Sequence, residues 1–188
     1  YAIKSAGTNY GSVRSLTTLV PGMGLAGNGN AIASGAASSV ANGTKFASLP
    51  VGASWTNTFT ITNNGTEALA LSGFGISDLR FEIEGMPATV AAGGASDFTV
   101  KFAPDAVGSF AGTLTISNDS PTAAYVVNLA GACFAASTNV GPFGGGNAVT
   151  FTNGNFGTIT NVLVGGGAAT ILDSGTSWFR VVMPAETS

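Results

Sequence analysis

The stretch that decides the fold is WTNTFTIT, residues 55–62. Every second residue in it is threonine, while Trp55, Phe59 and Ile61 occupy the other phase. A period of two places successive side chains on opposite faces of an extended strand, whereas a helix needs a period near 3.6. The sequence continues into Asn63-Asn64-Gly65, which is typical of a tight turn. Residues 55–62 therefore predict a half-buried β-strand followed by a reversal of the chain.

The same alternation recurs on both sides of this stretch. It predicts strands downstream at 69–71, 81–84, 97–102, 110–117, 125–131, 148–151, 159–164, 169–172 and 178–182, and upstream at 1–5 and 12–20. No 12-residue window combines a period of 3.6 with helix caps. Short strands at spacings of about 8–12 residues, separated by turn residues, indicate antiparallel sandwiches. We predict an all-β protein of Ig-like antiparallel β-sandwiches.

The predicted strands divide the chain into two unequal groups. Residues 28–132 contain enough strands for one complete Ig-like domain, and residues 141–188 contain about four more. Four strands are too few to close a second sandwich, and the two strands in residues 1–20 would need a host, because an isolated hairpin is marginally stable. We therefore predict a second domain split between the two chain ends, with linkers at 21–27 and 133–140.

The composition excludes several classes of function. The chain has no histidine, one cysteine, 6 basic and 9 acidic residues, and a net charge of −3. Imidazole chemistry, an internal disulfide and a cysteine zinc site are thereby ruled out. Six scattered basic residues argue against nucleic-acid binding, and no apolar run is long enough for a membrane span. We expect no catalytic residues, no cofactor and no metal, and we expect that the chain is not an enzyme.

A few single residues remain as candidates for a function. Glu82 and Glu84 lie on one face of a predicted strand, where a solvated face is a better interpretation than a cation site. Cys133 is expected to be a small buried apolar residue rather than a link or a modification site. Trp178 and Phe179 point to opposite faces of a strand, so one of them must face outward unless a partner covers it. They are our candidate interface aromatics.

The segment 28–132 resembles the choice-of-anchor D type of Ig-like module, which is related to the ASH and major-sperm-protein sandwiches. The resemblance rests on residues 59–69 (FTITNNGTEAL), 85–95, 98–104 and 112–119. Residues 141–184 resemble the first part of an IPT/TIG-type Ig domain, through Gly141-Pro142, ITNVLVGG at 159–166 and residues 168–171 and 181–185. Residues 1–20 resemble the last two strands of such a domain. The resemblance implies a fold and no catalytic residues.

This combination is similar to one repeat of the long tandem arrays of bacterial surface proteins. Residues 1–20 can close the split domain of their own chain, complete the domain of a neighbouring copy, or belong to a longer covalent array. The sequence begins at Tyr1 without a signal segment, so we expect a processed chain or a piece of a longer one.

The composition favours assembly. Few charged residues are available to protect strand edges from pairing with another chain. We predict a structural subunit of an extracellular filament, sheath or surface layer, bacterial in origin, built head to tail by β-strand complementation. Copies of the chain are then its partners, and we expect the donated strands to insert Ile3, Val13, Leu16 and Leu19. The alternative is an adhesive or carbohydrate-binding spacer module of a tandem-repeat surface protein.

Overall fold

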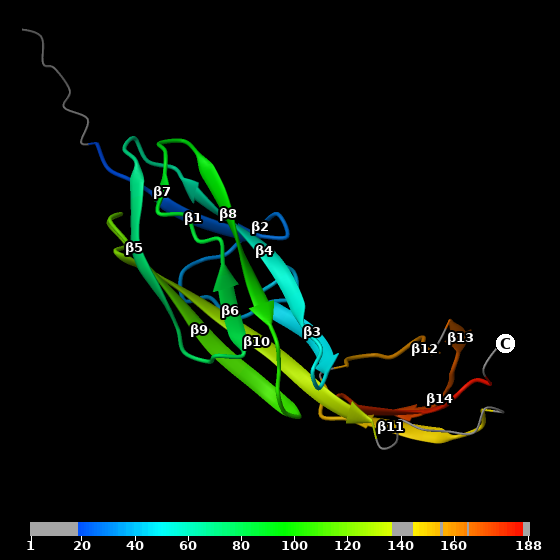
Figure 1. The fold of residues 1–188 in the computed structure, drawn as a ribbon. Helices are drawn as coiled ribbons and strands as arrows, with labels where there is room; N and C mark the ends of the chain where they lie inside the picture. Colours follow the sequence, from blue (N-terminus) through cyan, green and yellow to red (C-terminus); the bar gives the residue numbers. More distant parts are fainter. Residues whose placement is uncertain (1–18, 137–144, 155, 165, 186–188) are drawn as a thin grey trace, which may run out of the picture.

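The computed structural model describes residues 19–136, 145–154, 156–164 and 166–185 (Figure 1). These residues form fifteen β-strands and no helix. The prediction of an all-β protein with an Ig-like β-sandwich is confirmed. The strands are β1 (Met23–Gly27), β2 (Asn30–Ala31), β3 (Lys45–Pro50), β4 (Trp55–Asn63), β5 (Leu69–Ile76), β6 (Phe81–Glu84), β7 (Thr89–Val90), β8 (Ala95–Phe102), β9 (Gly108–Asn118), β10 (Ala124–Ala136), β11 (Ala148–Thr152), β12 (Leu163–Val164), β13 (Gly167–Ala168), β14 (Thr170–Ser174) and β15 (Trp178–Val182).

Strands β1–β10 form a two-layered structure that we call the sandwich. One layer has the strand order β2-β1-β4-β8-β6, and the other contains β10-β9-β5-β7 with β3 paired to β10. The longest ladders join β4 to β8, from Trp55 opposite Phe102 to Thr62 opposite Ala95, and β9 to β10, from Cys133 opposite Gly108 to Ala124 opposite Ser117. Both ladders are antiparallel, as the alternating pattern predicts.

The core of the sandwich consists of the apolar phase of these strands. Phe59 and Ile61 of β4, at 1% and 0% exposure, share a buried face with Phe98 and Phe102 of β8. The Phe59 and Phe98 rings lie 5.7 Å apart. From the opposite layer, β9 and β10 contribute Leu114, Ile116, Val127 and Leu129. The threonines of β4 take the outer phase, so the period of two in the sequence reflects a sheet with one buried and one solvated face.

Strand β10 continues beyond the sandwich into a second group of strands. Its last residues, Ala135 and Ala136, pair with Thr152 and Phe151 of β11, and β11 pairs in turn with β15 and β15 with β14. We call β11–β15 the C-terminal unit. The prediction of linkers is corrected here. Residues 23–27 form β1, and residues 133–136 form the end of β10 where a linker at 133–140 was expected. These segments pair with neighbouring strands, which satisfies their backbone groups.

The C-terminal unit is small. It contains the three-stranded sheet β14-β15-β11 and a short ladder of two residue pairs between β12 and β13. The predicted strand at 159–164 is wrong in its first part, since only Leu163–Val164 is a strand among these residues. The buried apolar residues of the unit are Val149, Phe179 and Val181.

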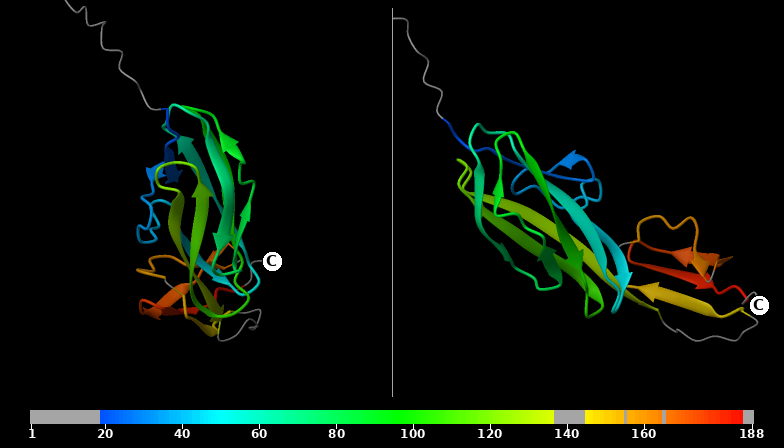
Figure 2. Two further views of the ribbon diagram at one scale, coloured as in Figure 1. Left: turned by 90° about the vertical axis from the view of Figure 1, so that its left-hand side faces the viewer. Right: turned by 45° about the horizontal axis from the view of Figure 1, so that its top comes forward.

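The two ends of the described sandwich lie at opposite poles (Figures 1 and 2). Val20 is bonded to Thr66 at the pole where β4 ends and β8 begins. The C-terminal unit is attached at the other pole, beyond Phe134, where β3 ends and β4 begins. The split of a second domain between the chain ends depends on residues 1–18, which lie outside the described residues.

Candidate functional site

The sheet of the C-terminal unit has an aromatic face. Phe151 and Phe179 stand opposite each other on β11 and β15, and their rings stack at 4.6 Å with an interplanar angle of 13°. Phe156 meets the Phe179 ring edge-on at 4.8 Å, and Phe134 at the end of β10 lies 5.3 Å from Phe156 and 5.8 Å from Phe151. The four rings connect the C-terminal unit to the pole of the sandwich by apolar packing.

The opposite face of the same sheet is polar and partly aromatic. Trp178 is 37% exposed, whereas its neighbour Phe179 is 7% exposed. Arg180 makes a two-pronged ion pair across the strands with Asp173 of β14, with Nε to Oδ1 at 3.1 Å and Nη2 to Oδ2 at 2.8 Å. Trp178 therefore faces outward and Phe179 inward. The role of both residues in an interface stays a prediction.

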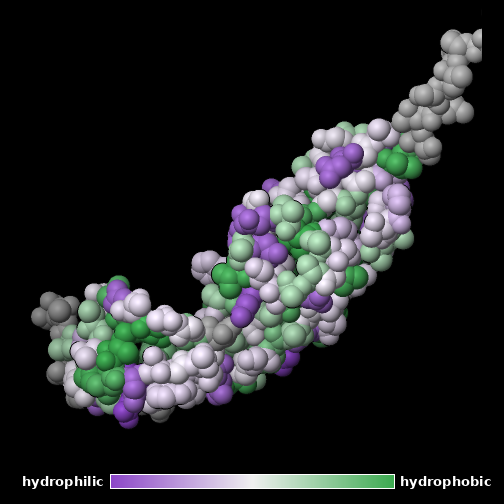
Figure 3. Space-filling view, turned by 180° about the vertical axis from the view of Figure 1, so that it is seen from behind, coloured by the Kyte–Doolittle hydropathy of each residue, from purple (hydrophilic) through white to green (hydrophobic). Residues whose placement is uncertain are grey.

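Large apolar side chains remain exposed on the C-terminal unit. Leu163 of β12 is 62% exposed and Leu172 of β14 is 47% exposed. The space-filling view shows apolar residues gathered on one side of this unit, whereas the sandwich shows a more mixed surface (Figure 3). Strand β14 is the last strand in its sheet order. The unit thus combines exposed leucines with a sheet edge that no described strand covers, and such surfaces mark interaction sites.

The predicted donor residues lie at the other pole. Ile3, Val13 and Leu16 fall outside the described residues. Leu19 is described, and its side chain is 57% exposed. The next residue, Val20, is fixed to the sandwich, because Thr66 N donates to Val20 O at 2.9 Å. The described chain therefore begins with an exposed leucine next to Val20, which is bonded to Thr66 at the pole opposite the C-terminal unit.

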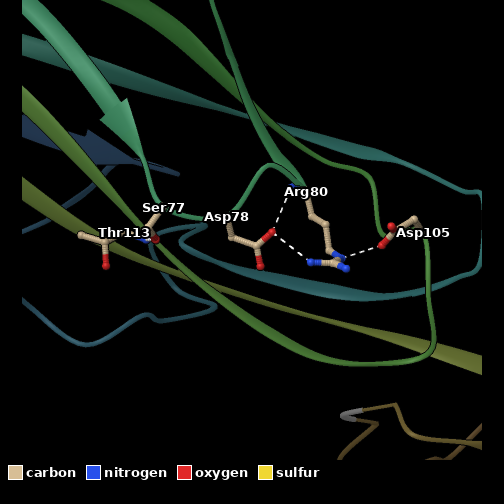
Figure 4. Close-up of polar contacts among 5 residues, drawn as sticks. All are labelled: Ser77, Asp78, Arg80, Asp105 and Thr113. Carbon is tan, nitrogen blue, oxygen red and sulfur yellow. Dashed lines mark hydrogen bonds and ion pairs between the residues drawn. The ribbon is translucent and has the colours of Figure 1, made fainter.

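A second candidate site is a cleft between the β5–β6 connection and the β8–β9 connection. Its volume is about 690 Å³, and its lining includes Asp78, Leu79, Arg80 and Asp105. The Arg80 guanidinium lies between two carboxylates, with Nε to Asp105 Oδ1 at 2.6 Å and Nη1 to Asp78 Oδ1 at 3.2 Å (Figure 4). It also stacks over the Phe110 ring at 4.3 Å.

The charges in this cleft stabilise one another. The hydrogen bond from Arg80 holds the pKa of Asp105 below its usual range, and the same bond raises the pKa of Arg80. Leu79 beside them is 90% exposed. The cleft is therefore lined by a fixed guanidinium, two carboxylates, the Ser77 hydroxyl and the apolar side chains of Leu79, Ala103 and Ala111. The sequence gives no signal for it, because Arg80 and Asp105 are 25 positions apart in unrelated turns.

The two glutamates singled out in the sequence lie on an exposed sheet face. Glu82 Oε2 accepts a hydrogen bond from Lys101 Nζ at 2.8 Å across β6 and β8, and this bond raises the pKa of Lys101. The charge of Glu84 raises the same pKa further. Both glutamates are exposed. This arrangement matches the interpretation as a solvated strand face, in which a lysine balances the acidic pair.

Cys133 lies on β10 with its side chain fully buried. Desolvation raises the pKa of its thiol, with a smaller contribution from the negative charge of Asp105. A neutral buried thiol is unreactive, as expected for a small apolar residue.

Within the described ranges, no group of three His, Cys, Asp or Glu residues could hold a metal ion, and no helix is long and apolar enough to cross a membrane. The absence of enzymatic activity stays a prediction.

The fold and these sites define an Ig-like β-sandwich with a small strand-rich unit attached to one pole. Residues 40–132 match the family model of the HYDIN/CFA65/VesB-like Ig-like domain. The match ends at residue 132, which is also the predicted end of the complete domain. It supports an Ig-like sandwich and does not distinguish the choice-of-anchor D type. No curated protein matches the chain.

Several solved structures are similar at low identity. A Porphyromonas gingivalis protein of unknown function is 14% identical over 63% of this chain and 50% of that chain, with a TM-score of 0.49. The ASH/PapD-like domain 7 of human CEP192 is 11% identical over 70% of this chain and 97% of that domain, with a TM-score of 0.42. The Vibrio cholerae VesB protease is 16% identical over 47% of this chain and 29% of that chain, with a TM-score of 0.38. The chain thus spans half the length of the Porphyromonas protein.

Proposed function

We propose that the chain is a structural subunit of an extracellular bacterial filament, sheath or surface layer, assembled head to tail by β-strand complementation. Residues 1–20 of one copy would complete the C-terminal unit of the next. In the finer classification, the sandwich would be a choice-of-anchor D module and the completed C-terminal unit an IPT/TIG-like domain. The observation that carries the proposal is the location of Leu19 and the C-terminal unit at opposite poles of the sandwich.

The length of the sandwich favours pairing between copies over closure within one chain. Strand β10 has 13 residues and runs from the pole of Val20 to the C-terminal unit, a distance of about 40 Å at ~3.3 Å per residue. Residues 1–18, fully extended, would use about 12 of their number to return over that distance, leaving about six for pairing. Six residues cannot supply the two strands predicted in residues 1–20. A neighbouring copy placed end to end needs no such return.

The C-terminal unit has the properties of an acceptor. Leu163 and Leu172 are exposed, and β14 is the last strand of its sheet. A donated strand would cover these leucines and satisfy backbone groups at a sheet edge, which is the usual energetic basis of strand addition. Burying a leucine contributes about 1.5–3 kcal/mol. The same end-to-end contact repeated in every subunit is heterologous, and it produces a filament when the rotation does not close.

The predicted donor segment differs in charge from the rest of the chain. Residues 1–20 contain two basic residues, Lys4 and Arg14, and no acidic residue. The chain as a whole has a net charge of −3, so the remaining residues have a net charge of −5. Residues 21–136 account for four of these five negative charges and residues 137–188 for one, so charge alone does not distinguish pairing between copies from closure within one chain.

The first experiment compares the full chain with a chain that lacks residues 1–20, by negative-stain electron microscopy and light scattering. We expect filaments of the full chain and monomers of the shortened one. A synthetic peptide of residues 1–20 should bind the shortened chain and change its tryptophan fluorescence. A monodisperse full chain that merely loses thermal stability on shortening would contradict assembly and indicate closure within one chain.

Matched substitutions distinguish the insertion of apolar side chains into a neighbour from a general effect of added charge. Replacing Ile3 and Val13 by aspartate should abolish filaments, because two charges would enter the neighbour's core. The control replaces Ala2 and Ser12 by aspartate, which adds the same charge on the opposite face of each predicted strand. On the acceptor, Leu163→Asp should weaken peptide binding more than Thr160→Asp. Equal effects within each pair would contradict insertion of the apolar side chains.

The second candidate function is a carbohydrate-binding spacer module, and the cleft at Arg80 is the observation that favours it. Fixed carboxylates and a guanidinium can form hydrogen bonds with sugar hydroxyl groups, and Leu79 offers an apolar contact. Binding to a glycan array that Arg80→Ala abolishes, while Arg180→Ala leaves it intact, would support this candidate. If the chain binds no glycan, the carbohydrate-binding candidate is rejected and the filament proposal remains.

A further inference from the structure

The third strand of the sandwich, β3, and its last strand, β10, run side by side in the same direction. Strand β3 pairs with β10 in parallel, with Lys45 opposite Ala130, Leu49 opposite Cys133 and Pro50 opposite Phe134. Every other strand pair among the described residues is antiparallel. Because the pair is parallel, β3 and β10 both run toward the pole to which the C-terminal unit is attached.

The segment before β3 is also attached to β10. Gly35 N donates to Val126 O at 2.8 Å, and Val126 N donates to Ser34 Oγ at 3.0 Å. Asn128 Nδ2 donates to the carbonyl oxygens of Gly35 and Ala36 at 3.1 and 3.0 Å. The buried hydroxyl of Tyr125 donates to Ile32 O. Ala130 N also donates to Thr44 O at 3.0 Å, so six hydrogen bonds join residues 32–44 to β10 in addition to the β3–β10 ladder.

Tension between the two poles would load these bonds together. Pulling the ends apart first loads β1 along β4, because β1 lies between Val20 and residues 32–50 in the chain. Once β1 has left β4, the force pulls residues 32–50 along β10. The bonds of a parallel ladder are slanted and evenly spaced, and they all cross from one strand to the other, so a force along the strands is shared by the whole ladder. A force across the strands would instead open the bonds one at a time.

We propose that residues 32–50 and β10 form a mechanical clamp, which makes the sandwich a tension-resistant link between the chain ends. This inference deepens the proposed function, because a head-to-tail filament transmits force through each subunit from pole to pole. The clamp itself belongs to the single chain and does not require assembly. The C-terminal unit, with three buried apolar side chains and a two-pair second ladder, is the weaker part in series with it.

The test is single-molecule force spectroscopy on the full chain, held by handles at its two ends at constant pulling speed. We expect a low-force event from the C-terminal unit, followed by a high-force event from the sandwich. Residues 23–136 would lengthen by about 350 Å in that second event, at ~3.5 Å per residue and after subtraction of the folded length. This increase in length identifies the second event as the unfolding of the sandwich.

Two triple variants separate the clamp from overall stability. The clamp variant combines Ser34→Ala, Tyr125→Phe and Asn128→Ala, which removes four of the six bonds between residues 32–44 and β10 and leaves the β3–β10 ladder in place. Its peak force should fall below that of the parent chain. The control combines Thr60→Val, Trp55→Phe and Ser77→Ala. It removes the bonds from Thr60 to Asp97, from Trp55 to Asn57 and from Thr113 to Ser77, none of which joins residues 32–50 to β10.

Thermal denaturation of both variants shows how far each lowers equilibrium stability. Forced unfolding is governed by the unfolding rate along the pulled direction, so the two quantities are separable. A peak force lowered in the clamp variant and retained in the control supports the clamp. Equal losses of force in both variants, or a sandwich that extends at no higher force than the C-terminal unit, would overturn it. Failure of the chain to form filaments would affect the proposed function and leave this result unchanged.

Discussion

Gly131 of β10 lies directly against the ring of Phe102 in the opposite layer, since a Cβ placed on Gly131 would be 2.5 Å from Phe102 Cε1 and Cζ. The ring cannot move aside easily. Phe102 is fully buried, stacks on Phe81 at 4.9 Å and contacts Phe46 at 5.7 Å. The two layers of the sandwich therefore approach each other at a position where only glycine fits.

The first prediction concerns this contact. Gly131→Ala should lower the free energy of unfolding by about 1–3 kcal/mol, because the added methyl group overpacks the core. Urea denaturation followed by fluorescence measures the change. Gly75→Ala is the control, because a Cβ at Gly75 meets no atom within 4 Å. A Gly131→Ala chain as stable as the control would show that the layers can separate at no cost.

The second prediction concerns the aromatic stack of the C-terminal unit. Phe179→Ala removes a buried ring that contacts both Phe151 and Phe156, which should cost about 3–5 kcal/mol. That loss falls on a unit with a small core, so the C-terminal unit should unfold while the sandwich persists. Backbone NMR spectra should show collapsed dispersion for residues 145–185 alone. Trp178→Ala, at the exposed neighbour, should leave both sets of signals dispersed.

The third prediction concerns Cys133. Its thiol is buried and its pKa is raised by desolvation, so iodoacetamide should alkylate the folded chain far more slowly than the urea-unfolded chain. The folded thiol retains its proton at a pH where the unfolded thiol, with a pKa near ~8.5, loses it. Stability should therefore fall as the pH rises above that value. The Cys133→Ala chain should show a smaller fall, and an identical pH profile would contradict the prediction.

The fourth prediction concerns Asp105. Its pKa is lowered in the folded chain by the bond from Arg80, so its contribution to stability is present above the unfolded pKa of about 4 and is lost as the pH falls through the lower folded value. Asp105→Asn should be somewhat less stable than the parent at pH 7, and the difference should vanish in acid. NMR titration of the Asp105 carboxyl carbon measures the folded pKa directly. An ordinary carboxyl titration would contradict the ion pair.

Most of the sandwich could be predicted from the sequence, because its central strands have one buried and one solvated face. Residues 55–62 and 110–117 lie in β4 and β9 as expected. Trp55 shares the inward phase of β4 but is 55% exposed, since it lies at the end of the strand and its indole N–H bonds to Asn57. The alternation therefore predicts which face of β4 a side chain occupies, but it does not predict how deeply a side chain at the end of the strand is buried.

The strands that were missed lack this alternation. Strand β1 is MGLAG, in which glycine and alanine provide no pattern, and β3 is KFASLP, whose buried residues Phe46 and Leu49 are three apart. A shift in register between Ala130 and Ala132 of β10 accompanies the β3 pairing. The parallel partner of β3 lies 85 positions further along the chain, from Lys45 to Ala130, so the pairing has no local sequence pattern. The cleft at Arg80 was missed for the same reason, because folding alone brings Asp78, Arg80 and Asp105 together.

Because β10 pairs with strands of both the sandwich and the C-terminal unit, the two parts fold in a fixed order. Residues 45–50 find their parallel partner only after residues 130–134 have left the ribosome or the secretion channel, so the sandwich closes late. The C-terminal unit takes its first strand pairing from the end of that same β10. Its sheet would therefore be templated by a sandwich that is already closed. In the assembly proposed above, each chain would therefore become able to accept a neighbour only in its last folding step.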